Sequence, residues 1–102
     1  MDKEKLYTLI TRGNAFQLEA ALQAGLNANA TLPSGEPMII AAACMGDTRL
    51  EMTKILAEHG ANINAPIGGM TLLKWIKQPS YCDNKGTIAF LKSKGAKEMD
   101  IQ

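Results

Sequence analysis

The chain is poor in the residues on which catalytic, metal-binding and disulfide-rich proteins depend. It has only two cysteines, Cys44 and Cys82, with no CxxC spacing and no histidine-rich surroundings, so neither a disulfide framework nor a zinc site is indicated. The single histidine, His59, directly precedes Gly60, and we expect it to interact with the dipole of a helix C-terminus rather than to catalyse. The chain also lacks GxSxG, GxxxxGKS/T and HExxH motifs. These absences predict no enzyme, no cofactor and no metal site.

Long apolar runs and a secretory leader are missing as well. No apolar stretch approaches the roughly 20 residues of a membrane span. Residues 1–5 read MDKEK, which is not the basic segment followed by an apolar one that a secretory signal requires. We therefore expect a cytoplasmic protein that makes no contact with a membrane.

Charge and aromatic content argue against nucleic-acid binding. The formal net charge is only +1, although residues 70–97 contain six lysines against one acid, Asp83. Nucleic-acid surfaces interleave arginines and stacking aromatics with such lysines, and Trp75 and Tyr81 alone are too few to indicate one. We interpret the lysines as a solvated outer surface and a C-terminal cap.

The chain does contain a short phrase that occurs three times. Its glycines, Gly25, Gly60 and Gly95, stand 35 residues apart, twice over. The three phrases are AALQAGLNANA at 20–30, ILAEHGANINA at 55–65 and FLKSKGAK at 90–97. Each glycine follows an apolar helical run, at the point where a helix end favours a left-handed residue. A fixed period in this range indicates a repeat array, in which each unit buries its apolar face by stacking on a neighbour.

The first unit is predicted to be a pair of short helices. Leu6, Leu9 and Ile10 have helical spacing, and Gly13 ends that helix. Asn14 is suited to cap a second helix, which continues to the first of the repeated glycines.

The second unit is predicted around an apolar run. Residues 38–45 are all apolar, so a helix here must be covered nearly all round, as the middle unit of a stack would be. Pro37 is expected at the first helical position, where its missing N–H has no consequence. Gly46 is expected to end this helix, and Asp47 or Thr48 to cap the next one.

The third unit departs from this pattern. Thr71 is expected to cap or to open its inner helix. Residues 78–84, QPSYCDN, replace a tight inter-helix turn, and Pro79 cannot lie inside a helix. The residues that follow Gly95 are expected to fray towards the C-terminus.

Taken in order, these features resemble the ankyrin repeat. Its usual line is roughly D-x-x-G-x-T-P-L-H-x-A-A-x-x-G-H, followed by an outer helix that ends L-L-x-x-G-A-D-V-N-A. The matching stretches are GEPMIIAAACMGD at 35–47, ILAEHGANINA at 55–65, GMTLL at 69–73 and GA at 95–96. The resemblance covers about residues 3–97. It implies an all-α fold, an ankyrin-repeat solenoid of three helix-turn-helix units at about 3–30, 31–65 and 66–97 in a single domain, 1–102.

The chain also differs from the ankyrin line in two respects. No unit keeps Thr-Pro-Leu-His intact. The two glycines of the first unit, Gly13 and Gly25, are 12 residues apart, whereas Gly46 and Gly60 in the second unit are 14 apart. The middle outer helix, or the segment leading into it, is therefore predicted to be about half a turn longer than usual.

The resemblance implies a module that binds another protein through a concave face of turns and inner helices, with no small-molecule substrate. By position in the repeat, the predicted contact residues are Thr11, Arg12, Pro33, Ser34, Glu36, Cys44, Met45, Ile67, Met70, Gln78 and Pro79, with Trp75 and Tyr81 nearby. Cys44 is open to two interpretations, a small buried hydrophobe or a contact residue. The segment 78–84 is likewise open, either an extension of the binding surface through Tyr81 or a tolerated surface insertion.

Two modes of action agree with a binding module of this size. In the one we favour, the chain is an inhibitor or immunity protein, similar in action to an antitoxin, and it occludes a toxin or enzyme. In the other it is a scaffold or adaptor subunit of a larger complex. The sequence does not name the partner.

Overall fold

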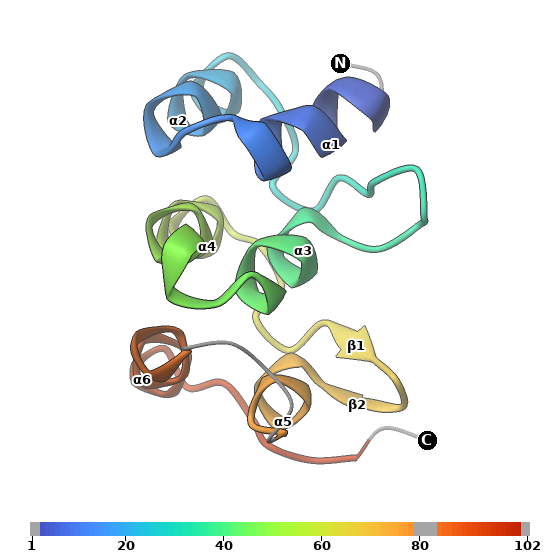
Figure 1. The fold of residues 1–102 in the computed structure, drawn as a ribbon, viewed down its shortest axis with the longest axis vertical. Helices are drawn as coiled ribbons and strands as arrows, with labels where there is room; N and C mark the ends of the chain where they lie inside the picture. Colours follow the sequence, from blue (N-terminus) through green and yellow to red (C-terminus); the bar gives the residue numbers. More distant parts are fainter. Residues whose placement is uncertain (1–2, 79–83, 101–102) are drawn as a thin grey trace.

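The computed structural model describes residues 3–78 and 84–100, which form three helix pairs stacked along the long axis of the molecule (Figure 1). The helices are α1 (Lys3–Arg12), α2 (Ala15–Gln23), α3 (Met38–Cys44), α4 (Leu50–Glu58), α5 (Leu72–Ile76) and α6 (Lys85–Ser93). The inner helices α1, α3 and α5 contact one another in turn, and so do the outer helices α2, α4 and α6. The two termini therefore lie at opposite ends of the stack.

Both helices of the first pair end as the sequence predicts, and the second is capped as expected. α1 ends at Arg12, directly before Gly13. Asn14 caps α2, because its Oδ1 accepts the Gln17 N–H at 2.8 Å while the Gln17 Oε1 accepts the Asn14 N–H at 3.1 Å. This reciprocal pair satisfies two backbone donors that would otherwise have no partner within the helix.

The repeated glycines end three helices in the same way. Gly25, Gly60 and Gly95 have φ values of +112°, +93° and +82°. The residue after each glycine donates its N–H to a carbonyl five residues earlier, as from Ala61 to Leu56 at 3.0 Å. The predicted left-handed stops are confirmed, and each turns the chain out of an outer helix.

The core runs through the middle of the stack, around α3. Five residues of this helix are buried: Met38, Ile39, Ile40, Ala42 and Ala43. α3 contacts α1, α4 and α5, so the predicted covering of the apolar run is confirmed. The position expected for Pro37 is wrong by one residue, because Pro37 has an extended ψ of 151° and occupies the N-cap, so that Met38 is the first helical residue.

The caps expected for α4 are also wrong. A single 3₁₀ turn, η1 (Gly46–Arg49), precedes Leu50, and neither Asp47 nor Thr48 caps the helix. This turn accounts for the two additional residues between the glycines of the second unit, so the expected lengthening before the middle outer helix is confirmed. The turn also frees two side chains to reach neighbouring helix pairs.

The side chains of η1 connect all three helix pairs. Arg49 donates from Nε to the Ile10 carbonyl at 3.1 Å and from Nη2 to the Thr11 carbonyl at 2.7 Å, at the C-terminus of α1. Asp47 points the other way and accepts the N–H groups of Gly86 and Thr87 at 3.1 and 2.8 Å, in the first turn of α6. A cation at a helix C-terminus and an anion at a helix N-terminus both complement the helix dipole.

Asparagines connect the exits of the three pairs. The Asn29 Oδ1 accepts the Asn62 N–H at 2.9 Å, and the Asn64 Oδ1 accepts the Lys97 N–H at 2.8 Å. Asn29 and Asn64 are 35 residues apart, which is also the spacing of the repeated glycines. The same contact between neighbouring helix pairs therefore occurs twice.

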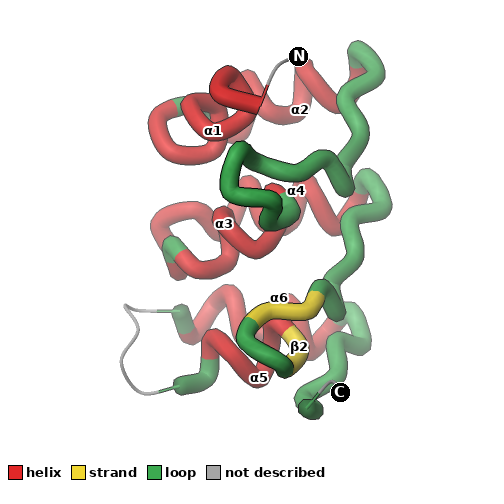
Figure 2. The backbone as a smooth tube through the Cα atoms, turned by 90° about the vertical axis from the view of Figure 1, so that its right-hand side faces the viewer, coloured by secondary structure: helices red, strands yellow, loops and turns green. Residues whose placement is uncertain are grey.

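The all-α expectation needs one correction. A short antiparallel hairpin is formed by β1 (Pro66–Ile67) and β2 (Met70–Thr71). The corresponding turn after α2 is closed by a single bridge between Thr31 and Pro37. Figure 2 shows these two turns one above the other at the same edge of the stack. The fold of the described residues is thus mostly helical, with a small two-stranded sheet.

The expected fraying after α6 is wrong as far as Asp100. The Thr71 N–H donates to the Met99 carbonyl at 2.9 Å, and the Thr71 hydroxyl donates to the Lys97 carbonyl at 2.6 Å. Thr71 occupies the N-cap position of α5, directly before the first helical residue, Leu72, but its hydroxyl binds this C-terminal segment and makes no hydrogen bond to the helix. The tail is therefore held along the last helix pair.

Candidate functional site

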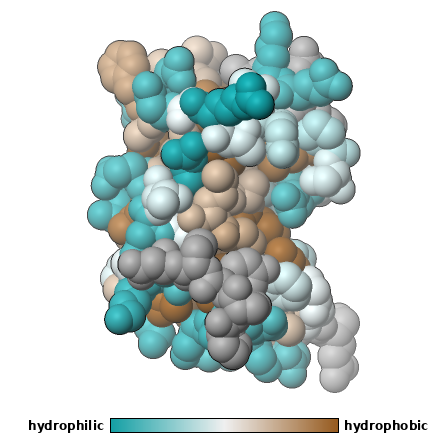
Figure 3. All heavy atoms as spheres, viewed as in Figure 1, coloured by the Kyte–Doolittle hydropathy of each residue, from teal (hydrophilic) through white to brown (hydrophobic). Residues whose placement is uncertain are grey.

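We call the surface formed by α1, α3, α5, the turn at residues 31–37 and the hairpin β1–β2 the inner-helix face. Apolar side chains gather in the middle of the view in Figure 3, over α3, between more hydrophilic flanks. The half-buried apolar residues of this part of the chain are Ala41, Cys44 and Met45, which also pack against the core. Cys44 packs against the core and keeps some exposure, so both of its interpretations stay predictions.

A groove lies between α1 and the first turn. It has a volume of about 480 Å³ and is lined by Glu4, Tyr7, Thr8, Pro33 and Ser34. Pro33 and Ser34 are exposed at the turn, as expected of contact residues. We call this the Tyr7 groove.

Three of the groove residues, Glu4, Tyr7 and Thr8, were missed by the sequence reasoning. The Tyr7 side chain is 55% exposed, while its neighbour Leu6 and Ile10 are buried. The helical periodicity could have indicated Tyr7, because a tyrosine on the polar side of an amphipathic helix cannot pack into the core and is left exposed. An exposed aromatic of this kind is typical of interfaces.

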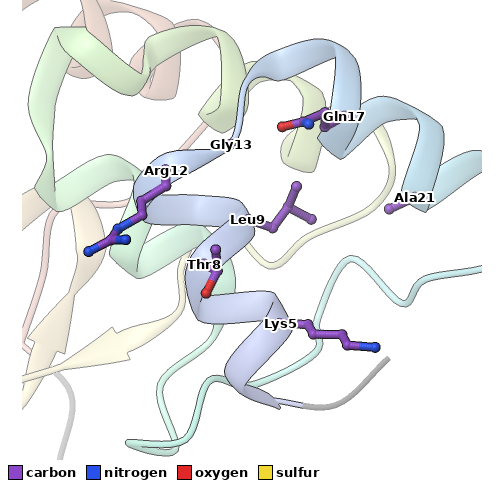
Figure 4. A pocket seen from close by; sticks show the side chains of 7 residues that line it. All are labelled: Lys5, Thr8, Leu9, Arg12, Gly13, Gln17 and Ala21. Carbon is purple, nitrogen blue, oxygen red and sulfur yellow. The ribbon is translucent and has the colours of Figure 1, made fainter.

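Arg12 lies apart from Pro33 and Ser34, the predicted contacts at the first turn. It lines a second groove of about 450 Å³, together with Lys5, Thr8, Leu9, Gly13, Gln17 and Ala21. In Figure 4, Lys5 and Arg12 extend in opposite directions on either side of Leu9. This groove lies between α1 and α2, at the end of the stack. The structure therefore does not bring Arg12 together with Pro33 and Ser34.

The predicted residues of the third unit are partly engaged with each other. Ile67 and Met70 face each other in the hairpin, and the Gln78 Nε2 lies 3.3 Å from the Met70 Sδ. Trp75 is half-buried and its ring covers Gly68, where an added Cβ would approach it to 2.3 Å. Trp75 therefore holds the hairpin against α5.

The remaining predicted residues contribute less to this surface. Glu36 is half-buried, and its carbonyl accepts the Leu32 N–H at 2.8 Å. Thr11 is half-buried, and its hydroxyl donates to the Tyr7 carbonyl at 2.8 Å. Pro79 and Tyr81 lie outside the described residues, so the two interpretations of segment 78–84 stay predictions.

The lysines of the third pair fall into two groups. Lys74 on α5 pairs with Asp100 at 2.7 Å, and Lys77, directly after α5, pairs with Glu98 at 2.9 Å. The hydrogen bond from Lys77 lowers the pKa of Glu98 below its ordinary value. On α6 the sequence KGTIAFLKS contains lysines and no acid. Lys74 and Lys77 are therefore not only part of a solvated surface, because each forms an ion pair with an acid of the C-terminal tail.

The single histidine joins the outer helices. His59 is the C-cap residue of α4, and its Nε2 lies 3.1 Å from the Glu19 Oε1 on α2. No set of three or more His, Cys, Asp and Glu side chains in residues 3–78 and 84–100 is placed to hold a metal ion. Within the same ranges, no helix has the length and apolar character needed to cross a membrane.

No family model matches the chain, and no curated protein sequence matches it either. Its function must therefore be inferred from the inner-helix face itself, which combines an apolar centre over α3 with the Tyr7 groove at one edge.

Proposed function

We propose that this chain is a small ankyrin-repeat solenoid of three helix-turn-helix units, which binds another protein through the concave side of its inner-helix face. The observation that carries the proposal is the apolar surface over α3, where Ala41, Cys44 and Met45 remain partly exposed beside two projecting turns. Small and sulfur-containing side chains give an adaptable surface for a partner.

The repeat part of the proposal is supported by contacts that recur with the sequence period. The left-handed glycines and the asparagine hydrogen bonds both repeat after 35 residues. Inner helices stack on inner helices, and outer helices on outer ones. This nearest-neighbour arrangement is typical of repeat proteins, whose extended inner surfaces bind other macromolecules.

A protein is a better-fitting ligand for this surface than a small molecule. Small-molecule sites enclose most of their ligand and are lined mainly by apolar side chains. The Tyr7 groove has five lining residues, two of them at the tip of a turn. A partner that spans the turns and α3 would bury a far larger area.

Occlusion is the mode of action that we favour. The chain would act as an inhibitor or immunity protein by covering the working surface of a toxin or enzyme. A scaffold or adaptor role is the alternative, and the partner's activity separates the two. Stoichiometric addition of the chain should abolish that activity in the first case and leave it unchanged in the second.

The proposal is tested by mapping where the native partner binds. A photocrosslinking residue is placed either at position 34, on the exposed turn, or at position 51, on the outer helix α4, where the Glu51 side chain is 73% exposed. The full chain is then irradiated in an extract of its native cells. We expect position 34 to capture one abundant protein that position 51 does not.

The captured protein is then purified and its affinity is measured by calorimetry. Met45→Ala should weaken binding by about 2 kcal/mol, roughly thirty-fold in Kd, as is typical of a central interface residue. Met99→Ala is the matched control, because the Met99 side chain is 49% exposed on the tail. Because Met99 is hydrogen-bonded to β2 of the same face, Phe16→Ala on the outer helix α2, where Phe16 is 81% exposed, is a second control that should leave the affinity unchanged. Unchanged affinity in a folded Met45→Ala variant would place the partner elsewhere and refute the proposed face.

A further inference from the structure

The Tyr7 groove has the chemistry to select one kind of side chain. Its apolar part is the half-exposed ring of Tyr7 beside Pro33, and its polar part is the carboxylate of Glu4 with the hydroxyls of Thr8 and Ser34. An aromatic face and a carboxylate in one groove both attract a cation. An anionic or purely aliphatic side chain would satisfy only part of this lining.

The charge in the groove is not matched by the rest of the described chain. The ion pairs in residues 3–78 and 84–100 involve Glu51, Glu19, Asp100 and Glu98 as acids, and Glu4 is in none of them. Lys5, the neighbouring base, lines the other groove of α1. Among the described residues that line the Tyr7 groove, Glu4 is the only charged one, so the charge of the groove itself is negative.

We propose that the Tyr7 groove receives an arginine side chain of the protein partner. This inference rests on the proposed function and adds the chemistry of the contact. The planar guanidinium of this arginine stacks on the Tyr7 ring and donates to the Glu4 carboxylate. The methylene groups of the arginine pack against Pro33. Arginine suits this lining better than lysine, because its planar group both stacks on an aromatic face and pairs with a carboxylate through a fork of donors.

The test is a titration of the full, ¹⁵N-labelled chain with the peptide Ac-Gly-Gly-Arg-Gly-Gly-NH₂, followed by NMR. The matched peptide contains citrulline, which keeps the planar shape and removes the charge. We expect saturable shifts of the backbone amides of Tyr7, Thr8 and Ser34 with the arginine peptide. The citrulline peptide should bind at least about three-fold more weakly, because the charge drives both contacts.

Variants locate the contact within the groove. Tyr7→Ala and Glu4→Gln should each weaken the arginine peptide about two- to five-fold, the range of one exposed cation–π or charge-assisted contact. Tyr7→Phe should retain the affinity. Phe16→Ala is the matched control. Phe16 is also an exposed aromatic residue on a short helix, but it lies on α2, is 81% exposed and does not line the groove. The same spectra report whether each variant is folded.

The outcomes separate this inference from the proposed function. Equal binding of the citrulline peptide, or shifts that centre outside the Tyr7 groove, would overturn the arginine contact and leave crosslinking from position 34 untouched. Conversely, a partner captured only from position 51 would refute the concave binding face, even if the arginine peptide bound beside Tyr7.

Discussion

The side chain of Arg49 offers the sharpest test of how the helix pairs are held together. It comes from η1 in the second pair and donates to the carbonyls of Ile10 and Thr11 in the first, at 3.1 and 2.7 Å. Arg49→Met keeps a long apolar stem and removes both donors. The two carbonyls at the end of α1 then lose their charged partner in a part-buried position.

The expected loss can be worked out from these two contacts. A hydrogen bond to a charged group contributes about 1.5–3 kcal/mol, and contacts made by one side chain do not add fully. A cation at a helix C-terminus contributes a further few tenths to 1 kcal/mol. Because part of the lost bonding is replaced by water, we expect the free energy of unfolding to fall by about 2 kcal/mol. For a domain of this size that lowers Tm by roughly 10 °C.

Thermal melts followed by circular dichroism measure this change. Lys54→Met is the matched control, since Lys54 is a half-exposed cation on α4 that pairs with Glu51 at 3.8 Å on the surface. Such a surface ion pair typically contributes less than about 1 kcal/mol. Hydrogen exchange should also show faster opening of α1 in Arg49→Met, because repeat units are stabilised by their neighbours. Equal melting of the two variants would show that the Arg49 contacts do not couple the pairs.

Two further predictions concern Gly60 and Asp47. Gly60→Ala should destabilise the chain by about 1 kcal/mol and Gly60→Val by more. The φ of Gly60 is +93° and no atom lies within 4 Å of an added Cβ, so the cost comes from the backbone conformation alone. Urea unfolding of the three proteins measures this loss, and equal midpoints would contradict the left-handed stop. The backbone N–H groups of Gly86 and Thr87 hold the pKa of Asp47 below its ordinary value of 3.8. Since the folded pKa is the lower one, this stabilisation is complete above the unfolded pKa and is lost as pH falls through the folded pKa. Asp47→Asn should therefore lower Tm at pH 6 and show a smaller further loss below about pH 4 than the parent chain, and parallel pH profiles of the two proteins would contradict the assignment.

Features that depend on neighbouring residues could be predicted from the sequence. Gly25 and Gly60 follow apolar helical runs, and only glycine takes a left-handed helix stop without a Cβ penalty. Asn14 caps α2 because its own side chain reaches the Gln17 N–H three residues on. The apolar run around α3 indicated a helix covered nearly all round, since it has no polar face to turn towards water. These physical causes act within a few residues, so they can be read before the fold is known.

The candidate site could be predicted only in part. Pro33 and Ser34 lie at an exposed turn because their residue types form turns, and both line the Tyr7 groove. Tyr7 itself was missed, because the sequence pattern indicates that a residue lies off the core but not which neighbour it faces. Arg12 is the opposite case. It was predicted as a contact residue from its position in the repeat, but its side chain lines a different groove.

Only the tertiary structure decided which partners the polar side chains chose. Asp47 has the residue type of a local helix cap, yet it caps α6, 39 and 40 residues further along the chain. Arg49 and the tail residues around Met99 likewise bind segments that are distant in sequence. A carboxylate or guanidinium satisfies any unpaired N–H or carbonyl that comes within reach, so residue type sets the kind of bond that forms. Stacking of the helix pairs then determines which helix end lies within reach, and this determines the partner.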